Sequence, residues 1–196
     1  KKIDAVVKLI LKDACGVKNV VESSNKAGLL KDLEKQQGEL ELCEKALADY
    51  MESKRRAFPR FYFVSTADLL DILSNGNNPV KVMTHMNKCF QAIEKLTLDT
   101  EKPAAGKRPK AKGIVSCVGK ETIPFQTEMA LAGKVEEYLN LIVDKMRSEL
   151  KLHCFDAMQA YGNPKPRHEW CFDWSSQLGL VVNQIYWCQE VESAFD

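Results

Sequence analysis

The side chains that most often carry chemistry, cysteine and histidine, form no recognisable site in this sequence of seven cysteines and three histidines. A metal centre needs several ligands at compatible spacing. His153 and Cys154 are neighbours, so on a helix they would point about 100° apart. His168 and Cys171 share a turn, but they are only two ligands. We therefore expect no metal site.

The cysteines do not indicate a disulfide framework either. No two of them form a C-x-x-C pair, and their number is odd. Cys43, Cys89 and Cys188 have apolar neighbours in the sequence. We expect these residues to be reduced thiols that pack as small apolar side chains.

Motifs for nucleotide chemistry and for nucleophilic catalysis are also missing from the sequence. A phosphate-binding loop requires G-x-x-x-x-G-K-[ST]. The Gly-Lys pairs at 106–107, 119–120 and 133–134 lack the Ser or Thr and the upstream glycine. No dinucleotide fingerprint or nucleophile elbow accompanies them, and His85 is expected on a solvated helix surface. We therefore predict no catalytic and no cofactor-binding residue.

The basic run KRPKAK, residues 107–112, is a candidate for binding phosphates or an acidic surface. The whole chain has a net charge of only +1, and no nucleic-acid-binding motif accompanies the run. We expect residues 101–113 to form a solvated loop. A nucleic-acid-binding module that uses residues 107–112 is the less favoured alternative, and a steep salt dependence of binding would reveal it.

An aromatic cluster follows Pro59, where Phe61, Tyr62 and Phe63 stand side by side. These rings could stack a nucleobase, but Pro59 disfavours helix before them and Ser65 resembles the N-cap of a helix after them. We predict a short strand in which Phe61 and Phe63 anchor the core. Tyr62 would then face a second surface, because successive strand residues point to opposite faces.

The totals describe a soluble, folded protein of 196 residues, with 45% hydrophobic and 28% charged residues. That length allows one ordinary domain or two small ones. No apolar run is long enough to span a membrane. Charged residues interrupt the apolar amino-terminal segment, which argues against a signal peptide and for the cytosolic side. The abrupt ends of the chain indicate a piece of a longer protein.

Apolar periodicity predicts mostly helix. Helices are expected over about 3–14, 27–56, 66–74, 79–96 and 133–161, and from about 175 to the end, where the apolar surface is broad. In the long helix the residues of one face recur at steps of four and three, as in a coiled coil: Leu29, Leu33, Gln36, Leu40, Cys43, Leu47, Tyr50 and Lys54. A helix of that length measures roughly 40 Å, so we expect an elongated molecule.

One β element is expected among the helices. The segment GIVSCVGKETIPF predicts a β-hairpin with its turn at Gly119-Lys120. The predicted fold class is therefore mostly α, an elongated multi-helix bundle with one small β-hairpin. We divide the chain into a helical segment at 1–100, a basic loop with the hairpin at 101–132, and a second helical segment at 133–196. Trp170, Trp174 and Trp187 are expected to fill interfaces between helices.

Several stretches resemble the linker region of dynein heavy chains. The segment FPRFYFVSTADLLDILSNG is similar to an aromatic-to-helix segment of that family, and LCEKALADYMESKRRAFPRFYF to the helix before it. KAKGIVSCVGKETIPF resembles a short β insertion, and VVNQIYWCQEVESAFD a helix near the carboxyl end of the linker. The resemblance covers essentially the whole chain in order. Axonemal chains of the outer arm are the family members most similar to two segments, DLLDILSNGNNP and NQIYWCQEV.

The resemblance implies a mechanical function. The linker of this family is a helical arm across a ring of AAA+ modules, and it bends and straightens as the ring binds and hydrolyses ATP. The fragment itself would hold no catalytic residue and no cofactor, because ATP and Mg belong to the ring. Its implied partners are that ring, the remaining linker, other dynein chains and microtubules, with neither membrane nor nucleic acid. The implied location is the ciliary or flagellar axoneme.

We expect bending to concentrate where packing is poorest. Gly38 inside the long helix and the break at Pro59 are the candidate soft points. The packing candidates are Phe61, Tyr62, Phe63 and Trp187. An independent helical scaffold or adaptor is the main alternative to a linker segment, and it would fold alone without an exposed apolar face.

Overall fold

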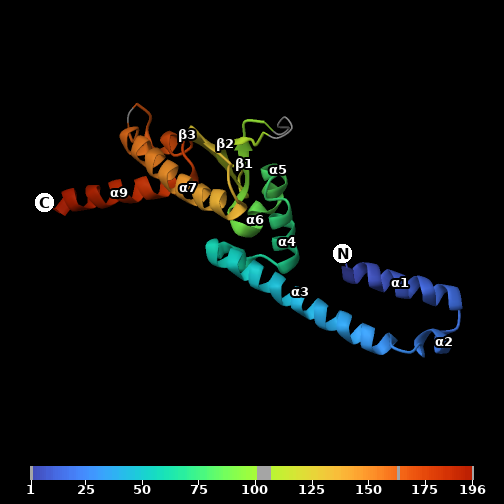
Figure 1. Ribbon diagram of the computed structural model, residues 1–196. Coiled ribbons are helices and arrows are strands. Elements are labelled where there is room, and N and C mark those ends of the chain that lie inside the picture. Colours follow the sequence, from blue (N-terminus) through green and yellow to red (C-terminus); the bar gives the residue numbers. More distant parts are fainter. Residues whose placement is uncertain (1, 101–106, 163, 196) are drawn as a thin grey trace. The chain divides into compact units, whose positions relative to one another are not determined.

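The computed structural model describes residues 2–100, 107–162 and 164–195 (Figure 1). The chain divides into two compact units, Lys1–Ser53 and Lys54–Asp196. The boundary differs from the division at residues 100 and 132 that we drew from the sequence. Each unit is described by itself. The fold is mostly helical with a small antiparallel sheet, which confirms the predicted class; the elongation stays a prediction.

The first unit consists of helices: α1 (Lys2–Val17), α2 (Val20–Ser24) and the part of α3 (Leu29–Ala57) up to Ser53. α1 extends beyond the end that we expected near residue 14, continues through Gly16, and ends before Lys18, whose φ of 57° is left-handed. The Asn19 side chain then caps α2 by accepting hydrogen bonds from Val21 N and Glu22 N. The long helix predicted over 27–56 is confirmed.

The second unit begins with short helices: η1 (Pro59–Phe63), α4 (Thr66–Ser74), α5 (Pro79–Val82), η2 (Met83–His85) and α6 (Met86–Cys89). Ser65 caps α4 as predicted and accepts a hydrogen bond from Asp68 N. Two predictions are wrong here. The aromatic segment is a 3-10 helix rather than a strand, and the helix expected over 79–96 ends at Cys89.

The sheet has three antiparallel strands in the order β1 (Ile93–Leu98), β2 (Lys110–Ser116) and β3 (Thr122–Ala130). β2 and β3 form the predicted hairpin, with positive φ at Gly119 and Lys120 in its turn. β1 was missed, since Ile93 and Leu96 had been assigned to a helix. Gly113 is required, because a Cβ there would lie 2.7 Å from the Ile123 carbonyl oxygen.

The expected basic loop is also partly a strand. Residues 110–113 belong to β2, while residues 101–106 lie outside the described part of the chain. The Lys110 and Lys112 ammonium groups both lie against the Glu128 carboxylate, at 3.1 and 3.3 Å. Arg108 donates to the Leu131 and Gly133 carbonyl oxygens and to Asn77 Oδ1. Most cations of the run therefore have partners within the fold, which weakens the nucleic-acid alternative.

The remaining elements are α7 (Val135–Gln159), α8 (Arg167–Trp170) and α9 (Ser176–Phe195). α7 packs against β3 and against α9 (Figure 1). The side chains of Phe58, Phe61, Leu69, Ile72, Met86, Tyr138, Leu139 and Ile142 are among the most deeply buried. A second cluster lies between α7, α8 and α9 and is built on Ala157, Trp170 and Val182.

The cysteines of the described residues are free thiols, but not all of them pack as expected. Cys89 is buried, whereas Cys43 and Cys188 are exposed, so our expectation of apolar packing is wrong for these two. Both lie on helix faces, in α3 and α9, that the described residues leave uncovered. Apolar neighbours in sequence indicated the face of the helix but not whether anything covers it.

Candidate functional site at the end of the long helix

The carboxyl end of α3 is held against α7 by polar contacts. Lys54 Nζ lies 2.6 Å from Glu136 Oε1, and the two side chains are only 14% and 8% exposed. One turn further along α7, Asn140 Nδ2 donates a hydrogen bond of 3.0 Å to the carbonyl oxygen of Ala57. That carbonyl lies in the last turn of α3, where four carbonyl groups have no partner within the helix. We call Lys54, Ala57, Glu136 and Asn140 the α3–α7 clamp.

An aromatic cluster follows the clamp directly. Phe58 and Phe61 are buried, and their rings meet edge to face with centroids 4.9 Å apart. Phe90, which follows α6, lies 6.2 Å from Phe58. The Arg60 guanidinium stands 4.7 Å from the centre of the Phe90 ring and donates to the Cys89 carbonyl oxygen. The chain reversal after α3 is thus anchored by three aromatic rings in edge-to-face and tilted contact and by one cation.

The geometry corrects the predicted roles of the aromatic residues. Phe61 is fully buried, as expected of an anchor, but Phe63 is 85% exposed and Tyr62 is 53% exposed. In a 3-10 helix residues three apart share a face, so Phe58 and Phe61 point inward together and Phe63 does not. Pro59 occupies the first turn of η1, and Phe58 before it is extended with φ of −134°. Because these rings are buried, Pro59 does not mark poor packing.

A polar layer lies beside this cluster, between α4 and the η2–α6 segment. Lys88 Nζ is 2.6 Å from Asp68 Oδ1, and the Ser65 hydroxyl donates to Asp68 Oδ2. These two hydrogen bonds lower the pKa of the Asp68 carboxyl. His85 Nε2 is 2.7 Å from Asp71 Oδ2, and the His85 side chain is only 12% exposed. The expectation of a solvated His85 is therefore wrong.

A buried carboxylate joins α7 to the sheet. Glu149 accepts a hydrogen bond from Gln126 N in β3 and forms an ion pair of 2.6 Å with Lys145. Lys145 also donates to the Thr127 hydroxyl. Burial acts to raise the pKa of the Glu149 carboxyl, but the hydrogen bonds from Lys145 and Gln126 N outweigh it and leave the pKa lowered. Glu149 therefore stays charged at neutral pH and links α7 to β3.

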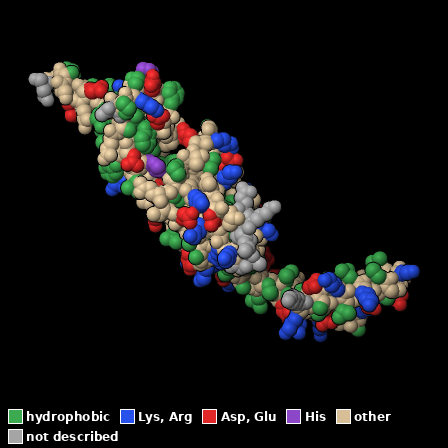
Figure 2. All heavy atoms as spheres, turned by 90° about the horizontal axis from the view of Figure 1, so that it is seen from above, with side chains coloured by type: hydrophobic (Ala, Val, Ile, Leu, Met, Phe, Trp, Pro, Cys, Tyr) green, Lys and Arg blue, Asp and Glu red, His purple; other side chains and the backbone are tan. Residues whose placement is uncertain are grey.

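The other sequence candidates lie outside these contacts. Gly38 lies within α3, and a Cβ added there would meet no atom within 4 Å. Trp187 lies on α9 and is 52% exposed, so its predicted place in an interface between helices is wrong; Trp170 is the buried indole. An apolar groove of about 640 Å³ runs along the same helix, lined by Leu180, Val181, Gln184, Ile185, Cys188 and Gln189. Figure 2 shows hydrophobic side chains on the surface around α7 and α9.

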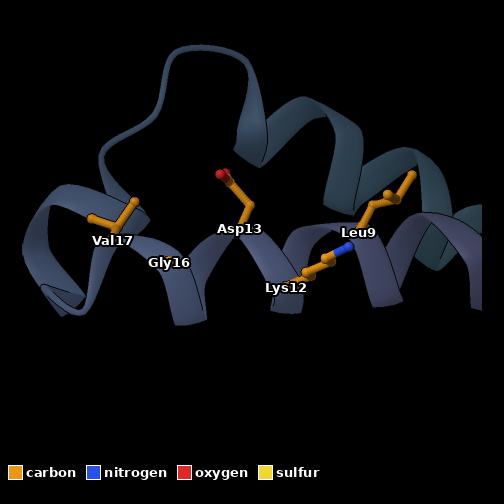
Figure 3. Close-up of a pocket in the computed structure, with 5 residues that line it drawn as sticks. All are labelled: Leu9, Lys12, Asp13, Gly16 and Val17. Carbon is orange, nitrogen blue, oxygen red and sulfur yellow. The ribbon is translucent and has the colours of Figure 1, made fainter.

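The described residues give little support for a catalytic or metal-binding function. They contain no group of three or more His, Cys, Asp or Glu side chains placed to hold a metal ion. A shallow depression of about 430 Å³ on α1 is lined by Leu9, Lys12, Asp13, Gly16 and Val17 (Figure 3). Its one carboxylate, Asp13, pairs with Lys26. Within the described ranges no helix is long and apolar enough to cross a membrane.

Sequence reasoning missed the clamp. Lys54 and Glu136 are separated by 82 positions, and each stands among ordinary helix-surface charges. The only signal was that Lys54 continues the apolar spacing of the long helix. That spacing placed Lys54 on the face with the coiled-coil repeat but did not indicate a carboxylate opposite it.

Comparison with known proteins agrees with the resemblance drawn from the sequence. Residues 1–157 match the family model "Dynein heavy chain, N-terminal region 2". The chain is 58% identical over 98% of its length to the dynein alpha chain of the flagellar outer arm from Chlamydomonas reinhardtii. It is 46% identical over 90% of its length to a ciliary dynein beta chain of Heliocidaris crassispina, and 43% identical over 98% to human dynein axonemal heavy chain 17.

The chain spans about 4% of the length of each of these relatives. The family match covers most of the chain, and the relatives align with nearly all of it. The order of elements also agrees with the resemblance, with the long helix, the aromatic break and the β element following one another. This chain belongs to the dynein heavy chain family, and its residues 1–157 correspond to N-terminal region 2 of that family.

Proposed function

We propose that this chain is a mechanical segment of an axonemal dynein heavy chain, part of a helical arm that bends and straightens as ATP is bound and hydrolysed elsewhere in the same polypeptide. The arm would transmit that change into movement along microtubules. The proposed location is the axoneme, since the relatives are named flagellar, ciliary and axonemal chains. The proposed partners are the AAA+ ring, the rest of the linker and other dynein chains, and ATP and Mg would bind in the ring.

The observation that carries this proposal is a contrast in packing along α3. At its carboxyl end, Lys54 is largely buried and paired with Glu136, and Ala57 receives the hydrogen bond from Asn140. Upstream, Leu33, Leu40 and Leu47 are 43%, 56% and 42% exposed. A helix anchored firmly at one end transmits force into the body that anchors it. Deformation concentrates in the part that has fewer contacts.

Gly38 lies in that less covered part. A glycine within a helix costs about 1 kcal/mol relative to alanine, because it has more backbone freedom to lose. The local helix is therefore easier to bend or open at Gly38 than at its neighbours. The clamp holds α3 rigid at 54–57, and Gly38 makes it compliant further upstream. We propose that bending takes place upstream of Lys54 rather than at Pro59.

The clamp can be tested in the full-length heavy chain. Asn140→Ala removes one hydrogen bond, worth about 1 kcal/mol. Lys54→Met leaves the largely buried Glu136 carboxylate without its cation, at a cost on the order of a few kcal/mol. Lys35→Met, at an exposed position upstream on the same helix, is the matched control. Microtubule gliding velocity and ATP turnover would be measured on the same preparations.

We expect both clamp variants to move microtubules more slowly per ATP hydrolysed, with the larger loss in Lys54→Met. Lys35→Met should behave as the unmodified chain does. A Lys54→Met chain that is destabilised in urea but moves microtubules at unchanged velocity would refute a role in force transmission. Equal losses of velocity and ATP turnover would place the defect in the ATPase cycle instead.

A further inference from the structure

One face of α3 has the repeat of a coiled coil, and the described residues leave it uncovered along most of its length. The α3 seam consists of residues that alternate by four and three: Leu29, Leu33, Gln36, Leu40, Cys43, Leu47 and Tyr50. Every position from 40 to 50 is exposed, and the three central leucines are at least 42% exposed. In a coiled coil such side chains insert between those of a partner helix. The exposed leucines therefore form a surface that is suited to packing against another helix.

The residues that flank the seam define the charge of that partner. On one side the row reads Asp32, Glu39 and Ala46, and on the other Leu30, Gln37, Glu44 and Met51. Neither row contains Lys or Arg. The lysines of this stretch, Lys31, Lys35 and Lys45, lie away from the seam. Because these flanking positions form the ion pairs between coiled-coil helices, two rows with three carboxylates and no cation favour a partner with basic flanks.

The same rows disfavour a second copy of this chain. In a parallel pair of identical helices, Glu39 of one copy would face Glu44 of the other, and the symmetry repeats this like-charge contact. In an antiparallel pair each row would face itself, so acidic residues would again meet only acidic or neutral ones. No register provides a cation at either flank. The seam is therefore suited to a different helix.

Gln36 adds a further requirement. It is the one amide on the seam, and its Oε1 atom is shielded from solvent and accepts no hydrogen bond among the described residues. A shielded acceptor without a donor costs free energy, and a partner could recover that cost by donating to Gln36 once its side chain turns outward into another rotamer. A single polar residue at such a position also fixes the register of a coiled coil. The partner is thus expected to present a donor opposite Gln36.

We propose that the α3 seam is a docking surface for an amphipathic helix that lies outside this chain. That helix has Lys or Arg along both flanks and a hydrogen-bond donor opposite Gln36. This interaction requires neither ATP nor bending of α3. It goes beyond the mechanical function proposed above and can fail independently of it.

The test uses the 196-residue chain and two synthetic helical peptides with leucine at the seam-facing positions and asparagine at the one facing Gln36. One peptide has lysine at all flanking positions and the other has glutamate there. Binding is followed by fluorescence anisotropy at low and high salt. We expect the lysine peptide to bind and to bind more weakly as salt rises, because exposed ion pairs are screened. The glutamate peptide should not bind measurably.

Two variants locate the binding. Leu40→Ala should lower the affinity for the lysine peptide by about tenfold or more, because the Leu40 side chain would bury apolar surface in the complex. Leu180→Ala, at a leucine that is 72% exposed on α9, is the matched control and should leave affinity unchanged. Equal binding of both peptides, no binding of either, or equal effects of the two variants would overturn the proposal. The proposal would also be overturned if the chain formed a dimer that Leu40→Glu dissociates.

Discussion

The burial of Phe61 and the exposure of Phe63 give opposite predictions for two phenylalanines separated by one residue. Phe61 is fully buried and meets the Phe58 ring edge to face, whereas Phe63 is 85% exposed. A strand would have placed both rings in the core, and the 3-10 helix places only Phe61 there. Replacing each in turn by alanine therefore tests the geometry of this segment directly.

The magnitudes follow from burial. Removing a buried phenylalanine side chain costs about 3–5 kcal/mol of unfolding free energy, a large part of the total stability of an ordinary domain. Phe61→Ala should therefore lower the midpoint of thermal unfolding of the second unit by about 10 °C. Phe63→Ala removes an exposed ring and should change the free energy by no more than about 0.5 kcal/mol.

Tryptophan fluorescence during urea unfolding is a suitable assay. All three tryptophans, Trp170, Trp174 and Trp187, belong to the second unit, so the signal reports that unit without interference from the first. Equal destabilisation by the two substitutions would refute the 3-10 assignment and restore the strand. A change below about 0.5 kcal/mol for Phe61→Ala would refute its role as an anchor.

Three other predictions concern single residues. Gly38→Ala should stabilise the middle of α3 by up to about 1 kcal/mol, because its Cβ meets no atom within 4 Å, and amide hydrogen exchange there should slow; unchanged exchange would contradict the compliance assigned to Gly38. Because the pKa of Glu149 is lowered from 4.5, its contribution to stability is complete above that pH and is lost as the pH falls through the folded-state pKa. The destabilisation caused by Glu149→Gln should therefore shrink between pH 7 and about pH 3 in urea titrations, and a constant difference would argue against a charged Glu149. Burial raises the pKa of the Cys89 thiol to about 11, so a thiol reagent at pH 7.5 should label the exposed Cys15, Cys43 and Cys188 first; rapid labelling of Cys89 in the folded chain would contradict its burial.

The elements that the sequence predicted correctly are those whose signal is local. The long helices extend over enough turns for their period to be unambiguous, as from Leu29 to Ala57. The N-cap at Ser65 and the turn at Gly119-Lys120 follow from side-chain chemistry within a few residues. These features need no knowledge of the rest of the fold, which is why they could be identified.

The errors occur where distant residues decide the structure. Met86, Phe90, Ile93 and Leu96 fit helical spacing, but Ile93 and Leu96 pair with Ser116 and Ile114 of β2 and become a strand. Short apolar runs fit either period, so the partner strand settles the outcome. Phe61 and Phe63 likewise alternate as in a strand, but the buried rings of Phe58 and Phe90 favour a tighter turn.

The two ends of the α3 seam show what periodicity leaves open. Lys54 and Leu40 occupy equivalent positions of one repeat. Lys54 is largely buried against a glutamate 82 positions away, while Leu40 is 56% exposed. The repeat alone identifies a face that binds another surface and does not distinguish the chain's own residues from those of a partner. Charge makes that distinction: the buried lysine has its carboxylate within the chain, whereas the acidic rows beside Leu40 have no basic row facing them in a second copy. A helix with basic flanks supplies that row, so the uncovered part of α3 selects its partner by charge.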